Sequence, residues 1–220
     1  MSVEPRTATF EYPLRSRTPE IWASGALRDP LALLSDHAYL EKKAALNAME
    51  LLNRWPDPAC AREWSICLAA IADDEASHLN SVMKILTKRG GCLDRNHRNP
   101  YASALRDLVR RGQANRELLD RLLVAALIEV RSCERFEVLS RYCLGEGKDA
   151  ELGRFFQRLG ASERGHFNIF LKLAAFAVAP SEVDTRWNEM LDLEAEILAA
   201  QPLGSRIHSG LASDNGGARA

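Results

Sequence analysis

Asp74-Glu75-Ala76-Ser77-His78 is matched 88 positions later by Ser162-Glu163-Arg164-Gly165-His166 (163 − 75 = 88). On an α-helix, a Glu and a His three positions apart project from one face, one turn apart. Each pair can therefore reach a single point beside its helix. The two Glu-x-x-His motifs predict a metal site that is built from two equivalent halves.

A further glutamate stands 34 positions before each motif, Glu41 in the first case and Glu129 in the second (75 − 41 = 34; 163 − 129 = 34). Both glutamates lie within apolar runs of helical period. One Glu from each of two helices and one Glu-x-x-His from each of two others form the di-iron or di-manganese site of ferritin-like bundles. The expected ligands are Glu41, Glu75 and His78 in one half and Glu129, Glu163 and His166 in the other, with Glu75 and Glu163 as bridges.

Four ionised carboxylates in one core would be costly without cations, so two divalent ions are expected to neutralise them. Glu134 and Glu137 are alternatives to Glu129, but only Glu129 preserves the internal repeat. Asp74 is expected either to accept a hydrogen bond from a metal-bound imidazole or to face solvent. For His37, one turn before the first glutamate, we expect helix packing or contact with a ligand in preference to metal binding.

The chain reads as an all-α, ferritin-like four-helix bundle with a long crossover and additional helices. Asp29-Pro30 and Asp57-Pro58 are expected helix starts, and Gly90-Gly91 is an expected stop. A capping box is expected at Ser181 to Asp184. The expected long helices are 30–54, 58–89, 116–143 and 149–178, with shorter helices at 101–111 and 181–200. Residues 1–202, including an N-terminal arm over 1–18, are expected to form one domain, and 203–220 a tail with a disordered Gly/Ala-rich end.

Composition excludes several classes of protein. At 220 residues and 46% hydrophobic content the chain can bury one core, and its net charge of −1 gives no global attraction to nucleic acid. Five cysteines without a Cys-x-x-Cys motif are typical of reduced thiols in the cytoplasm. The first 14 residues lack the apolar core of a signal peptide, and no apolar run approaches the ~20 residues of a membrane span. A soluble cytoplasmic protein is expected.

The segment from Lys88 to Arg116 carries a local charge of +6, from eight Lys and Arg against Asp94 and Asp107 (8 − 2 = 6). Such a segment suits contact with phosphates, although a solvated charged loop is the alternative. We expect it to surround the opening to the metal cluster. The candidate residues for binding nucleic acid are Lys88, Arg89, Arg95, Arg98, Arg110 and Arg111.

Three strings of residues carry a family resemblance: Ile128 to Phe136, Ser162-Glu163 with His166-Phe167, and Arg206-Ile207-His208-Ser209-Gly210. On them the chain resembles the tRNA hydroxylases that act on methylthio-isopentenyl-adenosine beside the anticodon, which are ferritin-like non-haem di-iron monooxygenases. The resemblance implies two iron ions, with manganese as the alternative, and a reaction of dioxygen that hydroxylates the isopentenyl side chain. It also implies tRNA and an external electron donor as partners.

Two other functions fit the same centre. One is the removal of peroxide or dioxygen, as in manganese catalases and rubrerythrins, although the rubredoxin-like Cys-x-x-Cys module is absent. The other is iron storage, which needs a large cage. The resemblance gives no role to the string from Arg206 to Gly210, which could dock the tail or bind phosphate.

Overall fold

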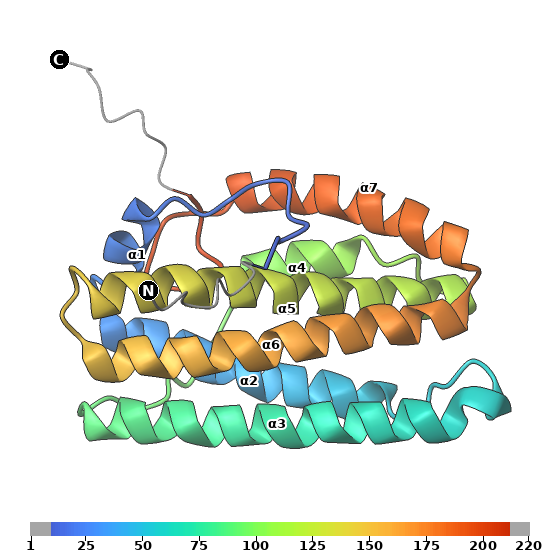
Figure 1. Cartoon of the computed structure of the whole chain (residues 1–220), viewed down its shortest axis with the longest axis horizontal. Coiled ribbons are helices and arrows are strands. Elements are labelled where there is room, and N and C mark those ends of the chain that lie inside the picture. Colours follow the sequence, from blue (N-terminus) through green and yellow to red (C-terminus); the bar gives the residue numbers. More distant parts are fainter. Residues whose placement is uncertain (1–9, 212–220) are drawn as a thin grey trace, which may run out of the picture.

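The computed structural model describes residues 10–211, and this part of the chain is helical without strands (Figure 1). The helices are α1 (Ile21–Ala26), α2 (Pro30–Leu51), the 3-10 turn η1 (Pro58–Cys60), α3 (Ala61–Lys88), α4 (Pro100–Asp107), α5 (Asn115–Leu144), α6 (Ala150–Ala177) and α7 (Pro180–Ala199). The all-α prediction is confirmed. No helix within 10–211 is long and apolar enough to cross a membrane.

The long helices α2, α3, α5 and α6 form a four-helix bundle (Figure 1). α2 pairs with α3 and α5 pairs with α6, each pair joined by a short connection. The segment between α3 and α5 carries α4 back along the whole bundle, so that α3 and α5 run in the same direction. This is the long crossover that the sequence predicts. α7 packs on α4, α5 and α6 and covers one side of the bundle.

Side-chain caps fix the predicted helix starts. Asp29 accepts a hydrogen bond from the Ala32 amide, and Asp149 accepts one from the Leu152 amide. Asp57 caps the 3-10 turn that leads into α3. At the other end of α3, Gly90 adopts a φ of 81°, which favours glycine and stops the helix. These caps set where α2 and α6 begin, and with it the level of their ligands, whereas α5 begins at Asn115 without a side-chain cap.

Two local predictions are wrong. The capping box at Ser181 does not form, because helix α7 begins at Pro180 and its N-cap Ala179 makes no side-chain bond. Proline at the first helical position has its φ already set, so the serine falls inside the first turn. The crossover helix ends at Asp107 instead of residue 111. There the Arg110 amide donates to the Asp120 carboxylate and leaves the helical pattern.

Both ends of the described chain lie against the bundle. In the arm, the Tyr12 hydroxyl donates to Glu137 on α5 at 2.7 Å, and the side chain of Tyr12 is buried. In the tail, Ile207 is fully buried, and its amide donates to Asp36 on α2 at 2.9 Å. The string around Ile207 therefore docks on the fold. The start of the arm and the Gly/Ala-rich end lie outside the described residues.

Candidate metal centre

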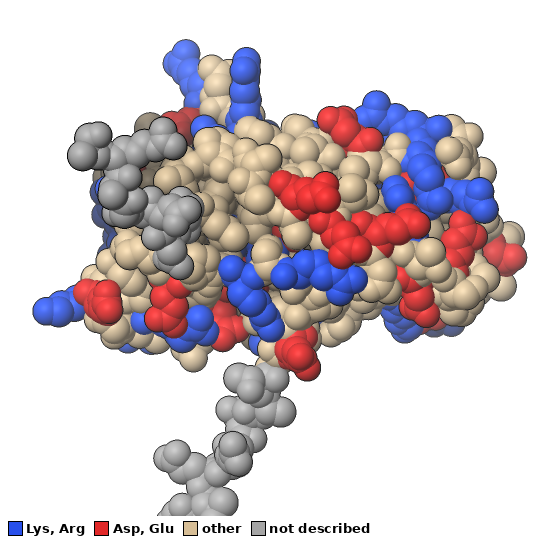
Figure 2. All heavy atoms as spheres, turned by 90° about the horizontal axis from the view of Figure 1, so that it is seen from above, with Lys and Arg blue, Asp and Glu red and all other residues tan. Residues whose placement is uncertain are grey.

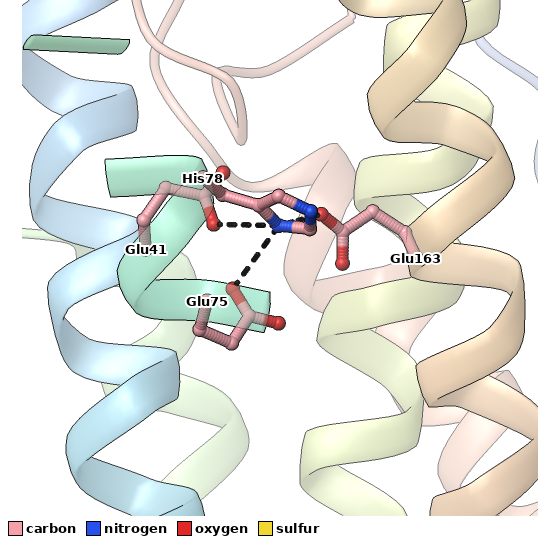
Figure 3. A group of neighbouring side chains, drawn as sticks. All are labelled: Glu41, Glu75, His78 and Glu163. Carbon is pink, nitrogen blue, oxygen red and sulfur yellow. Dashed lines mark ion pairs between the residues drawn. The ribbon is translucent and has the colours of Figure 1, made fainter. Parts of the chain in front are cut away.

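Side chains from all four long helices meet halfway along the bundle. Figure 3 shows Glu41 from α2, Glu75 and His78 from α3 and Glu163 from α6, which point toward one another. Ligand atoms of these four residues lie within 4.8 Å of one another. A second group with the same spacing is formed by Glu75, Glu129, Glu163 and His166. The structure thus brings together all six residues that the spacing of the sequence singled out.

The two groups share Glu75 and Glu163. Glu163 turns Oε1 toward Nδ1 of His78 at 3.4 Å and Oε2 toward Nδ1 of His166 at 3.3 Å. Glu75 turns Oε2 toward His78 at 3.7 Å and Oε1 toward His166 at 2.8 Å. Each of these carboxylates therefore faces both imidazoles with separate oxygens. This is the geometry expected of carboxylates that bridge two ions, whereas Glu41 and Glu129 belong to one group each.

The donor set fits a pair of cations. Ligand atoms about 2.1 Å from one ion lie roughly 3 to 3.5 Å from each other, which is close to the separations around His78. No hydrogen bond in the described part of the chain satisfies Nδ1 of His78 or either carboxylate oxygen of Glu163. Buried polar atoms without partners are costly, so their presence here points to a ligand. Oxygen and imidazole donors suit iron or manganese.

The pKa values of the clustered side chains show that the buried carboxylates need positive charge beside them. Burial raises the pKa of Glu75 to about 8, and the charge of Glu163 adds to the rise. Burial also holds the pKa of Glu129 well above its ordinary value. Burial opposes the charged forms of His78 and His166, yet neighbouring carboxylates, Glu163 above all, raise their pKa values to about 12 and about 10. In the absence of metal, protons therefore supply the charge that divalent cations would supply.

Two neighbours of the cluster hold its ligands in place. Oδ2 of Asp74 lies 3.2 Å from Nε2 of His166, the ring nitrogen that faces away from the cluster. Nε2 of His37 contacts Oε1 of Glu41, and its ring is fully buried. Burial lowers the pKa of His37 to about 4, so it is a neutral side chain at ordinary pH. Asp74 and His37 therefore each contact one predicted ligand, which is the kind of contact by which residues orient metal ligands.

The alternatives to Glu129 lie elsewhere. Glu134 accepts hydrogen bonds from the amide and hydroxyl of Thr18 at 2.6 and 2.5 Å. Glu137 accepts from the Tyr12 hydroxyl at 2.7 Å. Both glutamates therefore bind the N-terminal arm. The internal repeat selects the glutamate that belongs to the cluster.

Sequence reasoning missed a buried charged network beside the centre. Arg131 on α5 donates to both oxygens of Glu194 on α7, each at 2.9 Å, and both side chains are fully buried. The Tyr101 hydroxyl on α4 donates to the same carboxylate at 2.9 Å. The network ties the crossover helix and α7 to the bundle. Its only signal in the sequence is a set of charges within the apolar stripe of α5.

A cavity of about 120 Å³ between α2, α4 and α5 reaches Glu129 of the centre. Its apolar walls come from Leu40, Ala44, Val124, Ala125 and Ile128. The polar residues that line it are Lys43, Asn47, Asn99, Arg106 and Arg121. A second cavity of about 200 Å³ shares Arg106 and Arg121 with the first and extends to Arg111. The cavities give the cluster an apolar approach with a basic outer part.

The basic segment of the crossover surrounds this opening only in part. Lys88 and Arg89 form ion pairs with Glu151 and Asp149 where α6 begins, at the other end of the crossover. Arg110 is held by Asp120, with two side-chain bonds of 2.9 Å. Since the crossover spans the bundle, its two ends cannot face one opening.

The remaining residues predicted to bind tRNA lie at different places on the surface. Arg95 and Arg98 are exposed in the crossover, and Arg111 lines the second cavity. Figure 2 shows acidic and basic side chains interspersed on the face that carries α7. Binding of tRNA by the six predicted residues stays a prediction.

A four-helix bundle with two Glu-x-x-His motifs and two further glutamates around one centre defines the ferritin-like dimetal-carboxylate class. Within that class, the chain belongs to the family described as tRNA-(MS[2]IO[6]A)-hydroxylase (MiaE), whose model matches residues 6–209. The resemblance seen in the sequence is confirmed.

Curated relatives and a solved structure support this assignment. A protein of Pseudomonas putida named tRNA 2-(methylsulfanyl)-N(6)-isopentenyladenosine(37) hydroxylase is 33% identical over 211 residues, which cover 96% of this chain and 97% of the relative. A protein of the same name from Salmonella typhimurium is 25% identical and covers 90% and 88%. The fold is similar to Protein 43 with aldehyde deformylating oxygenase activity from Synechococcus, with a TM-score of 0.80, 27% identity and coverage of 94% and 100%.

Proposed function

We propose that this protein uses dioxygen to hydroxylate the isopentenyl side chain of a modified adenosine beside the anticodon of tRNA. The family and the names of both curated relatives support the substrate and the reaction. The observation that carries the proposal is the convergence of four glutamates and two histidines from four helices on one buried point.

We further propose that the six residues hold two iron ions. Glu41 and His78 would serve one ion and Glu129 and His166 the other, while Glu75 and the glutamate on α6 would bridge them. When bound, the iron pair would supply the activation of dioxygen for insertion of one oxygen atom into a C–H bond. Manganese has the same preference for oxygen and imidazole ligands, so the metal content of the purified protein decides the identity.

The protein contributes positioning and exclusion of water. Asp74 accepts a hydrogen bond from Nε2 of His166 and so leaves Nδ1 free to bind metal. His37 holds Glu41 from its buried side. Apolar walls along the cavity that reaches Glu129 keep water from the reacting carbon. The groups that orient the ligands therefore come from α2 and α3.

The same cavity supports an organic substrate. A prenyl chain is apolar and short, and it suits a pocket of about 120 Å³ whose walls are aliphatic. A base within an RNA stack cannot reach a buried metal, so the modified adenosine must leave the stack to react. Hydroxylation by dioxygen also consumes electrons and protons, which an external electron donor would deliver.

Mass spectrometry of tRNA nucleosides tests this function. Cells that lack the protein should lose the hydroxylated isopentenyl-adenosine, and cells that regain it should recover the nucleoside. The variant Glu163→Gln should fail to restore it, because it removes a charge that faces both imidazoles. Glu146→Gln is the matched control, because Glu146 is exposed and outside the cluster. An unchanged nucleoside profile in the deletion strain would contradict the proposal.

Peroxide removal and iron storage predict different results. Neither function changes the nucleosides of tRNA, and neither needs an apolar cavity beside the metals. If the deletion strain kept its tRNA profile but became sensitive to peroxide, the detoxifying function would replace the proposed one.

A further inference from the structure

Two cations at the cavity that reaches the metal centre lack an acidic partner. Lys43 on α2 and Arg106 on α4 both line this cavity. Nζ of Lys43 donates to Nδ1 of His97 at 2.9 Å, and Arg106 donates to the Ser103 hydroxyl at 3.2 Å. Over residues 10–211, neither cation forms an ion pair with a carboxylate. Their positive charge is therefore available to a ligand at the cavity.

Other cations around the cavity are offset by carboxylates. Arg121, the third cation that lines the cavity, donates to Glu117 at 2.9 Å, and Arg110, outside the lining, is held by Asp120 at the same distance. A guanidinium that is already paired with a carboxylate offers little to another anion. The contrast separates Lys43 and Arg106 from the rest of the basic residues nearby.

The ammonium group of Lys43 is positioned, not freely mobile. His97 receives its hydrogen bond on Nδ1 and contacts Asp36 through Nε2 at 2.8 Å. These two bonds require the neutral ring that carries its proton on Nε2. The ring of Tyr39 stacks on His97 with centroids 4.6 Å apart. His97 therefore holds the ammonium group of Lys43 in place, so binding of a ligand would cost less side-chain conformational entropy.

The two ends of the cavity differ in chemistry. Glu129 in its lining is buried beside aliphatic residues, whereas Lys43 and Arg106 are exposed. A nucleotide with a prenylated base has the same division, because an apolar chain and an anionic phosphodiester lie at opposite ends. Lysine binds phosphate as a point charge, and arginine binds it with a planar fork.

We propose that Lys43 and Arg106 bind a phosphodiester of the tRNA substrate at the mouth of this cavity and so direct the prenyl chain toward Glu129. The inference rests on the proposed function and deepens it, because it names the groups that recognise the RNA backbone. Contacts of this kind set the position of the substrate but carry no information about sequence.

The test measures RNA binding as a function of salt. The full chain, loaded with metal, is titrated with an anticodon stem-loop that carries the methylthio-isopentenyl-adenosine. Each lost phosphate contact should reduce the slope of log K against log salt by about 1, so Lys43→Gln/Arg106→Gln should reduce it by roughly 2. Each single variant should show about half of that change. The variant Lys43→Arg/Arg106→Lys keeps both charges and should retain the slope.

A matched control removes two charges elsewhere. Arg154 and Arg158 are exposed on α6 and form no ion pair with a carboxylate among the described residues. Arg154→Gln/Arg158→Gln should leave the slope at the wild-type value. If this pair and the cavity pair change the slope equally, the effect is one of net charge and the proposal is wrong.

A second readout separates this proposal from the proposed function. The free modified nucleoside has no phosphodiester, so the kcat/KM of Lys43→Gln/Arg106→Gln should fall much further on the stem-loop than on the nucleoside, through a rise in KM. Equal losses on nucleoside and stem-loop would overturn the phosphate contact, as would an unchanged salt slope. If the wild-type protein hydroxylates neither substrate, the proposed function fails instead.

Discussion

Replacing Glu41 and Glu163 separately by glutamine should distinguish a ligand of one ion from a bridge between two. Glutamine keeps the shape of the side chain but removes its charge. Glu163 faces His78 at 3.4 Å and His166 at 3.3 Å, whereas Glu41 approaches His78 alone of the two, at 3.6 Å. We expect about two ions per chain in the wild type, about one in Glu41→Gln and fewer than about one in Glu163→Gln.

The cost of leaving the centre without metal can be worked out from Glu75. A pKa of about 8 in place of 4.5 corresponds to ~5 kcal/mol against ionisation of its carboxyl group in the folded, metal-free chain. Because this folded pKa is raised, the stabilising contribution is complete below pH 4.5 and is lost as the pH rises through 8. The raised pKa values of His78 and His166 act in the same direction at higher pH. Glu163, whose pKa is lowered by the histidines against the effect of burial, acts only in the acid range.

Metal content and urea unfolding together check this reasoning. Each protein is saturated with iron under reducing conditions, freed of loose metal by gel filtration and analysed by plasma mass spectrometry. Metal-free wild type should lose stability between pH 5 and pH 8, and metal should restore it. Equal metal loss in Glu41→Gln and Glu163→Gln would refute the assignment of the bridge. A metal-free protein that gains stability over this pH range would refute the electrostatic argument.

Three further outcomes follow from the contacts. Glu194→Gln should lower the free energy of unfolding by about 3 kcal/mol in urea titrations, because it removes the charge that accepts from Nε and Nη2 of the buried Arg131 and leaves, in the described chain, only the carboxylate contact with Glu134 at 3.1 Å. Asp74→Ala should weaken metal binding at the site of His166 by roughly 10- to 100-fold in chelator competition, because that ring loses its acceptor. Burial opposes the charge of Asp120, but two arginines lower its pKa, so its stabilising effect is present above pH 3.8 and is lost in more acidic solution. The stability difference between wild type and Asp120→Asn should therefore shrink on acidification.

Each of these outcomes has a control and a contrary result. Asp192→Asn breaks an exposed ion pair with Arg15 and should cost less than about 1 kcal/mol, so an equal cost in Glu194→Gln would contradict the buried network. Asp73→Ala changes the residue beside Asp74, which is exposed, and should leave metal affinity unchanged. If the stability difference between wild type and Asp120→Asn stayed constant from pH 7 to pH 3, the stabilising role of the ionised Asp120 would be contradicted.

Helix starts and ligand spacing were predictable because both depend on short-range geometry. Asp29 caps α2 through the amide three residues later, and a Glu-x-x-His pair shares a face on any helix. The capping box at Ser181 was not predictable in this way, because Pro180 competes for the helix start. Two sequence signals at adjacent positions can each satisfy the local rules, and only the packed helix shows which one prevails.

Which basic residues pair with carboxylates could not be predicted from the sequence. Lys88 and Arg110 look alike as members of a basic segment, yet Glu151 neutralises the first and Asp120 the second. Lys43 belongs to no motif or basic segment of the sequence. The fold nevertheless places it at the cavity, without an acidic partner in the described chain. A charge is available only if no opposite charge packs against it.

The sequence by itself determined the helical class and the six ligands, because a repeat of equal spacing places equivalent residues at one level of antiparallel helices. Tertiary structure alone decided which buried charges pair, such as Arg131 with Glu194 across 63 positions, and where Ile207 of the tail docks. The physical reason is the different sequence separation over which the two kinds of interaction act. Helical periodicity acts over three or four residues, whereas pairing of charges depends on which helices lie side by side.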